Sequence, residues 1–346
     1  MTPTIRTFRE SFPEAFIAAL VNAGTEEMLT GNPYLNEVLV FNPQWKTLPV
    51  WERVKQETHF LREVRRRGFD LAVNLTEGDR GAFLCLLSGA RYRVGMYEKN
   101  STLWWKQRIF DQMVRIPNSR AHIVEQILEF PRSLGLPIRD TRVEIFFTDE
   151  DREKIRSLLQ EAGIGPRDPL VHIHPTSRWL FKCWRDEGVG RVIDRLQEKG
   201  DVRVVLTSGG EEKELEIIEQ IVQHCRTQPL SLAGKTTLKQ LAALSRRSQL
   251  FIGVDTAPMH IAAAVGTPVI ALFGPSGEFN WGPWGDGHVV IKKDMDCRPC
   301  GNDGCQGSKR SRCLEEISAE EVIGEALRML AQHGRAFHST LPGGSP

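Results

Sequence analysis

The feature that most constrains the fold is the alternation of short apolar runs with longer helical stretches along the chain. In the first part, β-rich apolar runs flank a charged, periodic stretch at 51–67 and stand at 16–22, 37–41, 70–76, 82–90 and 92–96. A second series has helices near 187–199 and 212–225, and apolar runs at 169–175, 201–208, 249–254 and 269–274. Apolar strands separated by helices are typical of parallel sheets built from βαβ units. The sequence therefore predicts an α/β protein with two Rossmann-like halves.

A length of 346 residues exceeds the usual limit of a single core, so two domains are expected. The polar stretch 139–154 is the predicted boundary region. We therefore expect one domain at 1–147, a second at 148–335 and a disordered tail at 336–346. Helix starts are indicated by Thr148 with Asp151, Thr237 with Gln240 and Ser318 with Glu321, because each pair suits a capping box.

Composition excludes several classes of protein. The formal charge is +1, from 45 basic and 44 acidic residues, which argues against bulk binding of nucleic acid. The longest apolar stretch, 261–273, is broken by Gly and Pro and is shorter than the roughly 18 residues that suggest a membrane span. The first fifteen residues carry charges where a signal peptide needs an apolar core. Seven cysteines, an odd number, favour a reducing cytosol over a disulfide scaffold. A cytoplasmic location is therefore expected.

The stretch GVDTAPMHIAAAVGTPVIALFGPS, 253–276, joins two apolar runs through its most polar residues. Asp255 and Thr256 follow a predicted buried strand, and open α/β sheets bind their ligands at this end of their strands. Pro258 suits the first turn of the next helix, whose free N–H groups and dipole favour a phosphate. The alternative is that Asp255 or Thr256 only caps the helix, which leaves His260 unexplained.

Two further strand ends carry polar residues. In HPTSRWLFKCW, 174–184, Thr176 and Ser177 offer hydroxyl and N–H groups, and Lys182 offers a positive charge for a diphosphate. His172 and His174 share one face of the preceding strand, but no third metal ligand is evident nearby.

In TSGGEEKELE, 207–216, Glu212 or Glu211 is suited to accept hydrogen bonds from ribose hydroxyls. Solvated acids in the first helical turn explain these two residues nearly as well. Together the three strand ends favour a ligand made of a ribose and a diphosphate.

A resemblance to a known family is carried by the three stretches above, by LAGKTTLKQLAAL, and by the block DCRPCGNDGC followed by RCLEEIS. By these motifs the chain resembles the bacterial heptosyltransferases of glycosyltransferase family nine over nearly its whole length. The resemblance implies a GT-B architecture of two Rossmann-like domains with the active site in the cleft between them. It also implies inverting transfer of L-glycero-D-manno-heptose from ADP-heptose to the lipopolysaccharide core, without a cofactor or metal. The N-terminal domain would bind the acceptor and the C-terminal domain the donor.

The same resemblance assigns roles to residues at the three strand ends. Thr176, Ser177 and Lys182 would face the donor phosphates, and Glu212 would face the ribose. The phosphate and sugar would be contacted by Asp255, Thr256, Ala257 and His260. Ala257 stands where the family usually has Gly, and its methyl group would tighten the site or alter donor preference.

The family's opening strand, Gly-Asp turn and catalytic Asp have no counterpart here, because MTPTIRTFRESFPEA matches only the helix that follows them. The first strand is central in the usual strand order, so its absence predicts unpaired backbone groups in its neighbours. We therefore expect the natural protein to extend upstream of Met1; the alternative is a shortened relative that only binds nucleotide or does nothing. The catalytic and acceptor-binding residues stay unassigned, since Glu77 and Asp79 lie on a loop where acids are usually just solvated.

Other clusters have two interpretations each. Close spacing suggests zinc or an iron–sulfur cluster for Cys297, Cys300, Cys305 and Cys313, but it matches no standard metal motif and favours reduced structural thiols. A solvated helix end or contact with a phosphorylated acceptor fits Arg62, Arg65, Arg66 and Arg67. A third cluster contains Trp104, Trp105, Lys106 and Arg108. These residues suit peripheral contact with the inner membrane, the lining of the acceptor cleft, or ordinary core packing.

Three functions follow from this sequence. The first is an inverting ADP-heptose transferase acting on the lipopolysaccharide inner core. The second keeps the fold but changes the donor or the acceptor, because a nucleotide-sugar site does not specify its sugar. The third is a catalytically dead nucleotide-binding module.

Overall fold

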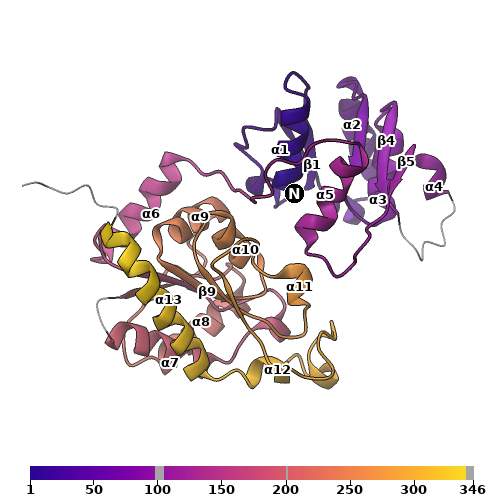
Figure 1. Cartoon of the computed structure of the whole chain (residues 1–346). Helices are drawn as coiled ribbons and strands as arrows, with labels where there is room; N and C mark the ends of the chain where they lie inside the picture. The colour runs from indigo at the N-terminus through magenta and orange to yellow at the C-terminus, as the bar shows by residue number, and fades with distance from the viewer. Residues whose placement is uncertain (98–104, 200–201, 340–346) are drawn as a thin grey trace, which may run out of the picture. The chain divides into compact units, whose positions relative to one another are not determined.

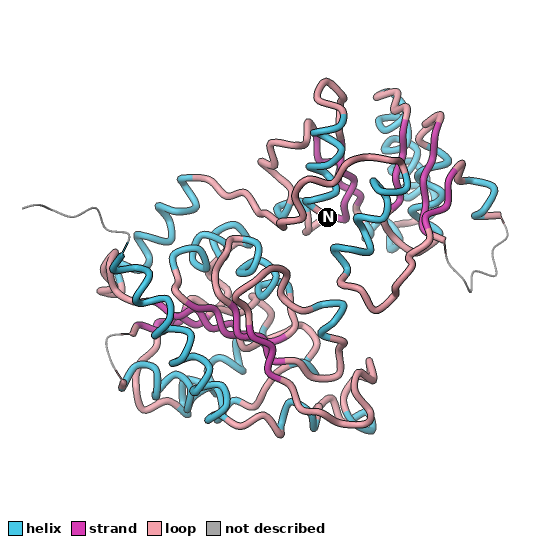
Figure 2. Tube along the Cα trace, in the orientation of Figure 1, coloured by secondary structure: helices cyan, strands magenta, loops and turns pink. Residues whose placement is uncertain are grey.

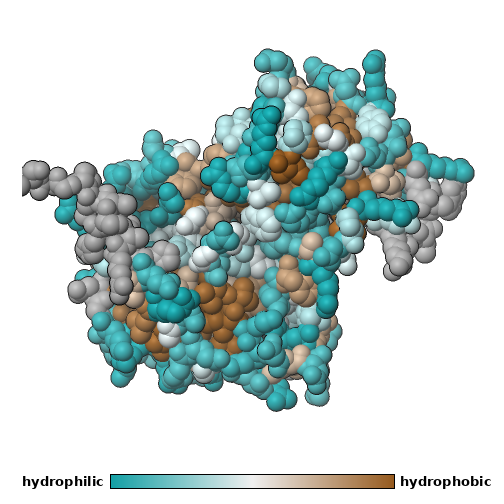
Figure 3. Space-filling view, viewed as in Figure 1, coloured by the Kyte–Doolittle hydropathy of each residue, from teal (hydrophilic) through white to brown (hydrophobic). Residues whose placement is uncertain are grey.

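The computed structural model describes residues 1–97, 105–199 and 202–339 and forms two compact units, Met1–Thr141 and Arg142–Pro346 (Figure 1). Both units are built from parallel strands connected mostly through helices, as the alternating apolar pattern predicts. Hydrophilic residues cover much of the face seen in Figure 3, and hydrophobic residues gather in patches on it. No helix in the described ranges combines the length and the apolar content needed to cross a membrane.

The first unit contains two separate parallel sheets. Strand β1 (Ala18–Asn22) pairs with β2 (Glu37–Phe41), from Ala18 opposite Glu37 to Asn22 opposite Phe41. The second sheet has the order β3-β4-β5, formed by Leu71–Asn74, Tyr92–Met96 and Gln112–Val114. Within the described residues, β1 and β3 each pair on one side only.

The helices of the first unit are α1 (Thr2–Ser11), α2 (Val50–Arg66), α3 (Asp79–Leu87), α4 (Lys106–Ile109) and α5 (Ile123–Ser133), with short 3-10 turns at Glu26–Met28 and Pro43–Thr47. The apolar run 82–90, grouped above with the β-rich runs, lies largely in helix α3. That run contains no β-branched residue, and Ala82 and Cys85 face inward one helical turn apart. These residues therefore favour a helix, and the expectation of a β-rich run at 82–90 is wrong.

The second unit is a single six-stranded parallel sheet of order β11-β10-β9-β6-β7-β8. Its strands are β6 (Leu170–His174), β7 (Arg203–Leu206), β8 (Leu230–Ser231), β9 (Leu250–Val254), β10 (Val269–Leu272) and β11 (Val289–Ile291). The tube in Figure 2 shows these strands gathered in one layer with helices on both sides. The strands β6, β7, β9 and β10 lie within the apolar runs at 169–175, 201–208, 249–254 and 269–274, as the sequence predicts.

Eight helices belong to the described part of the second unit. They are α6 (Asp149–Glu161), α7 (Asp186–Glu198), α8 (Glu212–His224), α9 (Leu238–Arg247), α10 (Ala257–Ala264), α11 (Glu278–Trp281), α12 (Arg312–Glu315) and α13 (Ala319–Ser339), with 3-10 turns at Leu180–Lys182 and Cys305–Gly307. The capping boxes at Thr148, Thr237 and Ser318 are confirmed by hydrogen bonds in both directions. The tail expected at 336–346 overlaps α13 as far as Ser339, and 340–346 lie outside the described residues.

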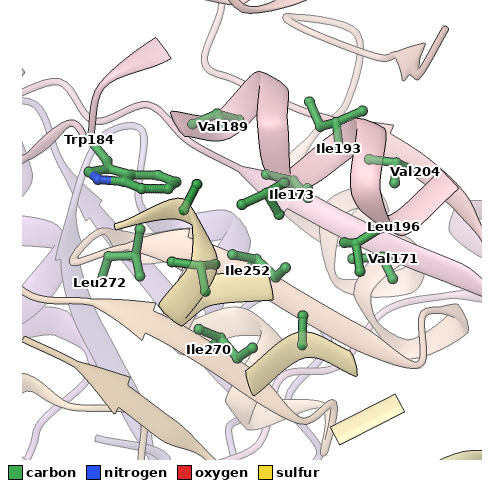
Figure 4. Close-up of a cluster of buried hydrophobic side chains, with 14 of the residues drawn as sticks. Val171, Ile173, Trp184, Val189, Ile193, Leu196, Val204, Ile252, Ile270 and Leu272 are labelled. Carbon is green, nitrogen blue, oxygen red and sulfur yellow. The ribbon is translucent and has the colours of Figure 1, made fainter. Parts of the chain in front are cut away.

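The two faces of this sheet bury different clusters of side chains. One face packs against α7, α8 and α13, with Val171, Ile173, Ile193 and Leu196 among the contacts (Figure 4). The other face packs against α6, α9 and α10 through Leu170, Leu244 and Phe251 with their neighbours. Because both faces are covered, all five residues of β6 and of β9 are buried, the two histidines of β6 included.

Candidate functional site

Three polar turns meet at one edge of the second sheet. Strands β9, β6 and β7 are adjacent and parallel, so the turns that begin at Asp255, Pro175 and Thr207 leave the sheet at the same end. This end carries the carboxyl termini of the strands, where open α/β sheets bind their ligands. The sequence predicted this convergence from the order of apolar runs and polar turns alone.

Lys182 and Asp255 come together across this edge. Lys182 ends the 3-10 turn after β6, and its Nζ donates to Oδ2 of Asp255 over 2.6 Å. The Asp255 side chain is 9 % exposed, whereas that of Lys182 is 23 % exposed. The ammonium group therefore stands between a buried carboxylate and the open side of the site. An anionic group that arrives there meets a cation already held in place.

Thr176 and Ser177 are buried directly after β6. The Thr176 hydroxyl donates to Oε2 of Glu214 over 2.6 Å, and the same oxygen accepts the backbone N–H of Gly209 over 3.0 Å. Oγ of Ser177 accepts the backbone N–H of Trp179. Glu214 thereby joins the turn after β6 to the turn after β7.

Glu214 was missed by the reasoning from sequence, which singled out Glu212 or Glu211. Both of those residues are exposed at the start of α8, whereas Glu214 is buried. The signal that would have found it is helical spacing, because Glu214 lies one and two turns before Ile218 and Ile221 on the buried face of α8. The ribose contact of Glu212 stays a prediction.

Helix α10 begins at the end of β9. Thr256 is the N-cap residue by backbone conformation, but its side chain makes no capping hydrogen bond, and Asp255 is engaged by Lys182. Pro258 lies in the first turn, as predicted. Ala257 is exposed, and Thr256 and His260 are partly buried. The interpretation of Asp255 and Thr256 as mere side-chain caps is therefore wrong, because neither side chain caps the helix.

Buried histidines lie beneath the same edge. His172 Nδ1 is 2.9 Å from Ser245 Oγ, and its Nε2 is 2.7 Å from Thr207 Oγ1. His174 Nδ1 is 2.8 Å from the same Thr207 oxygen. Burial lowers the pKa of His174 to about 3 and that of His172 well below its ordinary value, so both rings are neutral. Their contacts are hydroxyl groups rather than metal ligands.

The remaining predicted residues are placed as follows. Oδ1 of Asp79 pairs with Nζ of the buried Lys106 at 3.0 Å, while Glu77 is exposed. The guanidinium of Arg67 binds both carboxylate oxygens of Glu37, which lowers the pKa of that carboxyl through the hydrogen bonds from Arg67. The guanidinium group of Arg67 is therefore bound to a carboxylate of its own unit and does not stand free to bind a phosphorylated acceptor substrate.

The cysteine block follows β11. Cys297, Cys300 and Cys305 are exposed and Cys313 is buried, and all four are free thiols. Within 1–97, 105–199 and 202–339, no three His, Cys, Asp or Glu residues are grouped closely enough to hold a metal ion. Trp104 lies outside the described residues, and Trp105 stacks on Phe83 in the first unit.

A parallel α/β sheet with polar turns at the carboxyl ends of its strands defines the class of Rossmann-like proteins, which bind their ligands at this edge. The sequence profile of glycosyltransferase family 9 (heptosyltransferase) matches residues 58–310. The chain belongs to this family and is a glycosyltransferase.

Comparison with curated and solved proteins agrees with this assignment. The chain is 35% identical over 337 residues to the lipopolysaccharide heptosyltransferase 3 of Escherichia coli (strain K12), covering 96% of this chain and 94% of that protein. A family 9 glycosyl transferase from Veillonella parvula DSM 2008 superposes with a TM-score of 0.80 at 24% identity, covering 96% and 92% of the two chains. The E. coli heptosyltransferase WaaC with ADP superposes with a TM-score of 0.71 at 17% identity, covering 95% and 94%. The fold is therefore that of the GT-B glycosyltransferases.

Proposed function

We propose that this protein transfers heptose from ADP-L-glycero-D-manno-heptose to the inner core of lipopolysaccharide, with inversion at the anomeric carbon. The observation that carries the proposal is the 35% identity, over nearly the whole of both chains, to a lipopolysaccharide heptosyltransferase 3. The meeting of Lys182, Asp255 and the start of α10 at one strand edge supports it, because an ADP leaving group needs this kind of electrostatic partner.

In this proposal the unit Arg142–Pro346 binds the donor and the unit Met1–Thr141 binds the acceptor. Lys182 and the N-terminus of α10 stabilise the negative charge that builds on the β-phosphate as the glycosidic bond to ADP breaks. Thr176, Ser177, Asp255, Thr256, Ala257 and His260 surround the phosphates and the sugar, and Glu212 contacts the ribose. The general base that takes the acceptor proton is not assigned to a described residue.

A replacement at Lys182 tests the donor site. Lys182→Met removes the positive charge but keeps most of the side-chain length, and Lys154→Met removes a charge from an exposed position on α6 of the same unit. A hydrogen bond to a charged group contributes about 1.5 to 3 kcal/mol, which corresponds to roughly a tenfold to hundredfold change in affinity. Calorimetric titration with ADP should show that loss in Lys182→Met and no change in Lys154→Met. Equal affinity in both variants would contradict the proposed site.

Turnover distinguishes an enzyme from a nucleotide-binding module. The assay supplies ADP-heptose and a lipopolysaccharide core that lacks the heptose, and it follows release of ADP and the mass of the core. The proposal predicts addition of one heptose to the core, with release of one ADP. Binding of ADP without any transfer would favour the module, and absence of both would reject the donor site.

We also propose that the protein works in the cytoplasm and contacts the inner membrane through the start of α2. Val50, Trp51 and Val54 are exposed there, at 79%, 67% and 52%, beside the exposed cations Lys46 and Lys55. Exposed apolar side chains among basic ones suit an anionic lipid surface, where the acceptor is anchored. The proposed membrane contact does not use Lys106 of the cluster at 104–108, because Lys106 is buried and ion-paired.

Sedimentation with vesicles tests the membrane contact. We expect Trp51→Ser to weaken binding to vesicles that contain phosphatidylglycerol, whereas Trp281→Ser, at a 45% exposed position in the other unit, should bind as the wild type does. Vesicles of phosphatidylcholine alone should bind less. Equal sedimentation of the two variants would contradict this contact.

A further inference from the structure

A buried chain of hydrogen bonds ends at the strand edge that carries the proposed donor site. It runs from Ser245 on α9 through His172 and Thr207 to His174, and no member is more than 4% exposed. His174 is the last residue of β6 and stands opposite Gly253 of β9, two residues before Asp255. Only one ring nitrogen of His174, Nδ1, has a hydrogen bond within the described residues.

The positions of the protons in this chain follow from counting donors. Thr207 has one hydroxyl proton but faces two ring nitrogens, so it donates to one and accepts from the other. Every proton in the chain therefore points the same way, either from Ser245 towards His174 or in the reverse direction. The direction is fixed by whichever end would otherwise bury an unsatisfied donor.

Ser245 decides the direction. Its side chain is fully buried, and among the described residues the hydrogen bond with Nδ1 of His172 is the one that Oγ makes. If His172 donated to it, the Ser245 hydroxyl proton would have no acceptor, and an unsatisfied buried donor costs about 1 to 3 kcal/mol. Ser245 therefore donates to His172, His172 donates to Thr207, and Thr207 donates to Nδ1 of His174. This leaves the proton of His174 on Nε2.

Nε2 of His174 is a donor without an acceptor inside the described part of the protein. It is not among the polar atoms that are both sealed from solvent and unsatisfied, so it keeps some contact with solvent although His174 as a whole is only 4% exposed. Thr176, Lys182 and Asp255 lie on the turns that leave this same edge. A neutral N–H group held rigidly there suits an anionic oxygen, because it donates a hydrogen bond and keeps its own orientation through Thr207.

We propose that the Nε2–H of His174 donates a hydrogen bond to the diphosphate of the bound nucleotide, and that Ser245, His172 and Thr207 hold it in the tautomer that can do so. This inference rests on the proposed function, since it requires a nucleoside diphosphate at this edge. His174 is then a binding residue, and the other three are positioning residues.

Two replacements at His174 separate the two ring nitrogens. An Asn side chain reaches the position of Nδ1 and keeps the contact with Thr207, whereas a Gln side chain reaches the position of Nε2. Calorimetry uses ADP and, as a probe without phosphates, adenosine. His174→Asn should weaken ADP binding about tenfold or more and leave adenosine binding unchanged, and His174→Gln should recover part of the loss. His59→Asn, at an exposed position on α2, is the matched control.

The outcomes are distinct. Equal ADP affinity in His174→Asn and the wild type overturns the inference alone, as does an equal loss for ADP and adenosine. A wild-type protein that does not bind ADP overturns the proposed function as well. Nitrogen-15 spectra of histidine-labelled wild-type protein need no variant to fold: they should show the Nε2–H tautomer for His174 and a shift of that nitrogen when ADP is added. An Nδ1–H tautomer, or no shift, contradicts the proposal.

Discussion

Lowering the pH from 7 to 5 should destabilise the unit Arg142–Pro346 through its two buried histidines. The pKa of His174 in the folded protein is about 3, and that of His172 is also lowered, in both cases mainly by burial. In the unfolded chain both titrate near 6.5, so below that pH the unfolded state binds more protons than the folded one. Their stabilising contribution is therefore complete above about pH 6.5 and falls below it, in the case of His174 until the pH reaches about 3.

The size of the effect follows from this difference. Each pH unit between the folded and unfolded pKa values costs about 1.4 kcal/mol, so at pH 5 His174 should cost about 2 kcal/mol. His172, whose pKa is lowered in the same direction by burial, should add to this loss. The measurement is urea unfolding at pH 7 and pH 5, supported by hydrogen exchange of the β6 amides, for the wild type and for the double variant His172→Gln/His174→Gln. The double variant removes the titration, although it is less stable at both pH values. If both proteins lose the same free energy of unfolding between pH 7 and pH 5, the assignment of two neutral histidines is refuted.

Three further predictions concern stability and reactivity. Thr148→Ala removes the capping box of α6 and should lower the free energy of unfolding by about 1 kcal/mol in urea, while Thr47→Ala, at an exposed site, should change it much less. Ile193→Ala opens a cavity in the fully buried cluster under α7 and should cost about 2 to 5 kcal/mol; a cost below 1 kcal/mol would contradict the packing. Burial raises the pKa of Cys85, Cys183 and Cys225 to about 11, so Ellman's reagent at pH 8 should react first with the exposed Cys297, Cys300 and Cys305, and rapid reaction at Cys85 would contradict this order.

The sequence predicted most of the second unit because its signals there are local. Continuous apolar runs marked β6, β7, β9 and β10, and capping pairs marked the starts of α6, α9 and α13. Proline in the first turn marked α10, whose start places Asp255 beside Lys182. Because parallel strands end at the same side of a sheet, the alternation of strands and helices also predicted that the polar turns lie at one edge.

What the sequence did not reveal depends on contacts between distant residues. Glu214 and Glu212 are two residues apart in the same acidic helix start, and only packing of α8 turns the first towards Thr176 and the second towards solvent. The link between His172 and Ser245 joins residues 73 positions apart. The prediction for the run 82–90 was wrong for a local reason. A short apolar run has no periodicity that separates a buried helix from a strand, and this run lies largely in helix α3.

The most direct measurement of the central claim is the crystal structure of the protein with ADP. We predict that the diphosphate lies at the carboxyl edge of β6 and β9, with Lys182 Nζ and the first turn of α10 within hydrogen-bonding distance of its oxygens. A diphosphate bound elsewhere on the protein, with Lys182 still engaged only by Asp255, would contradict the account.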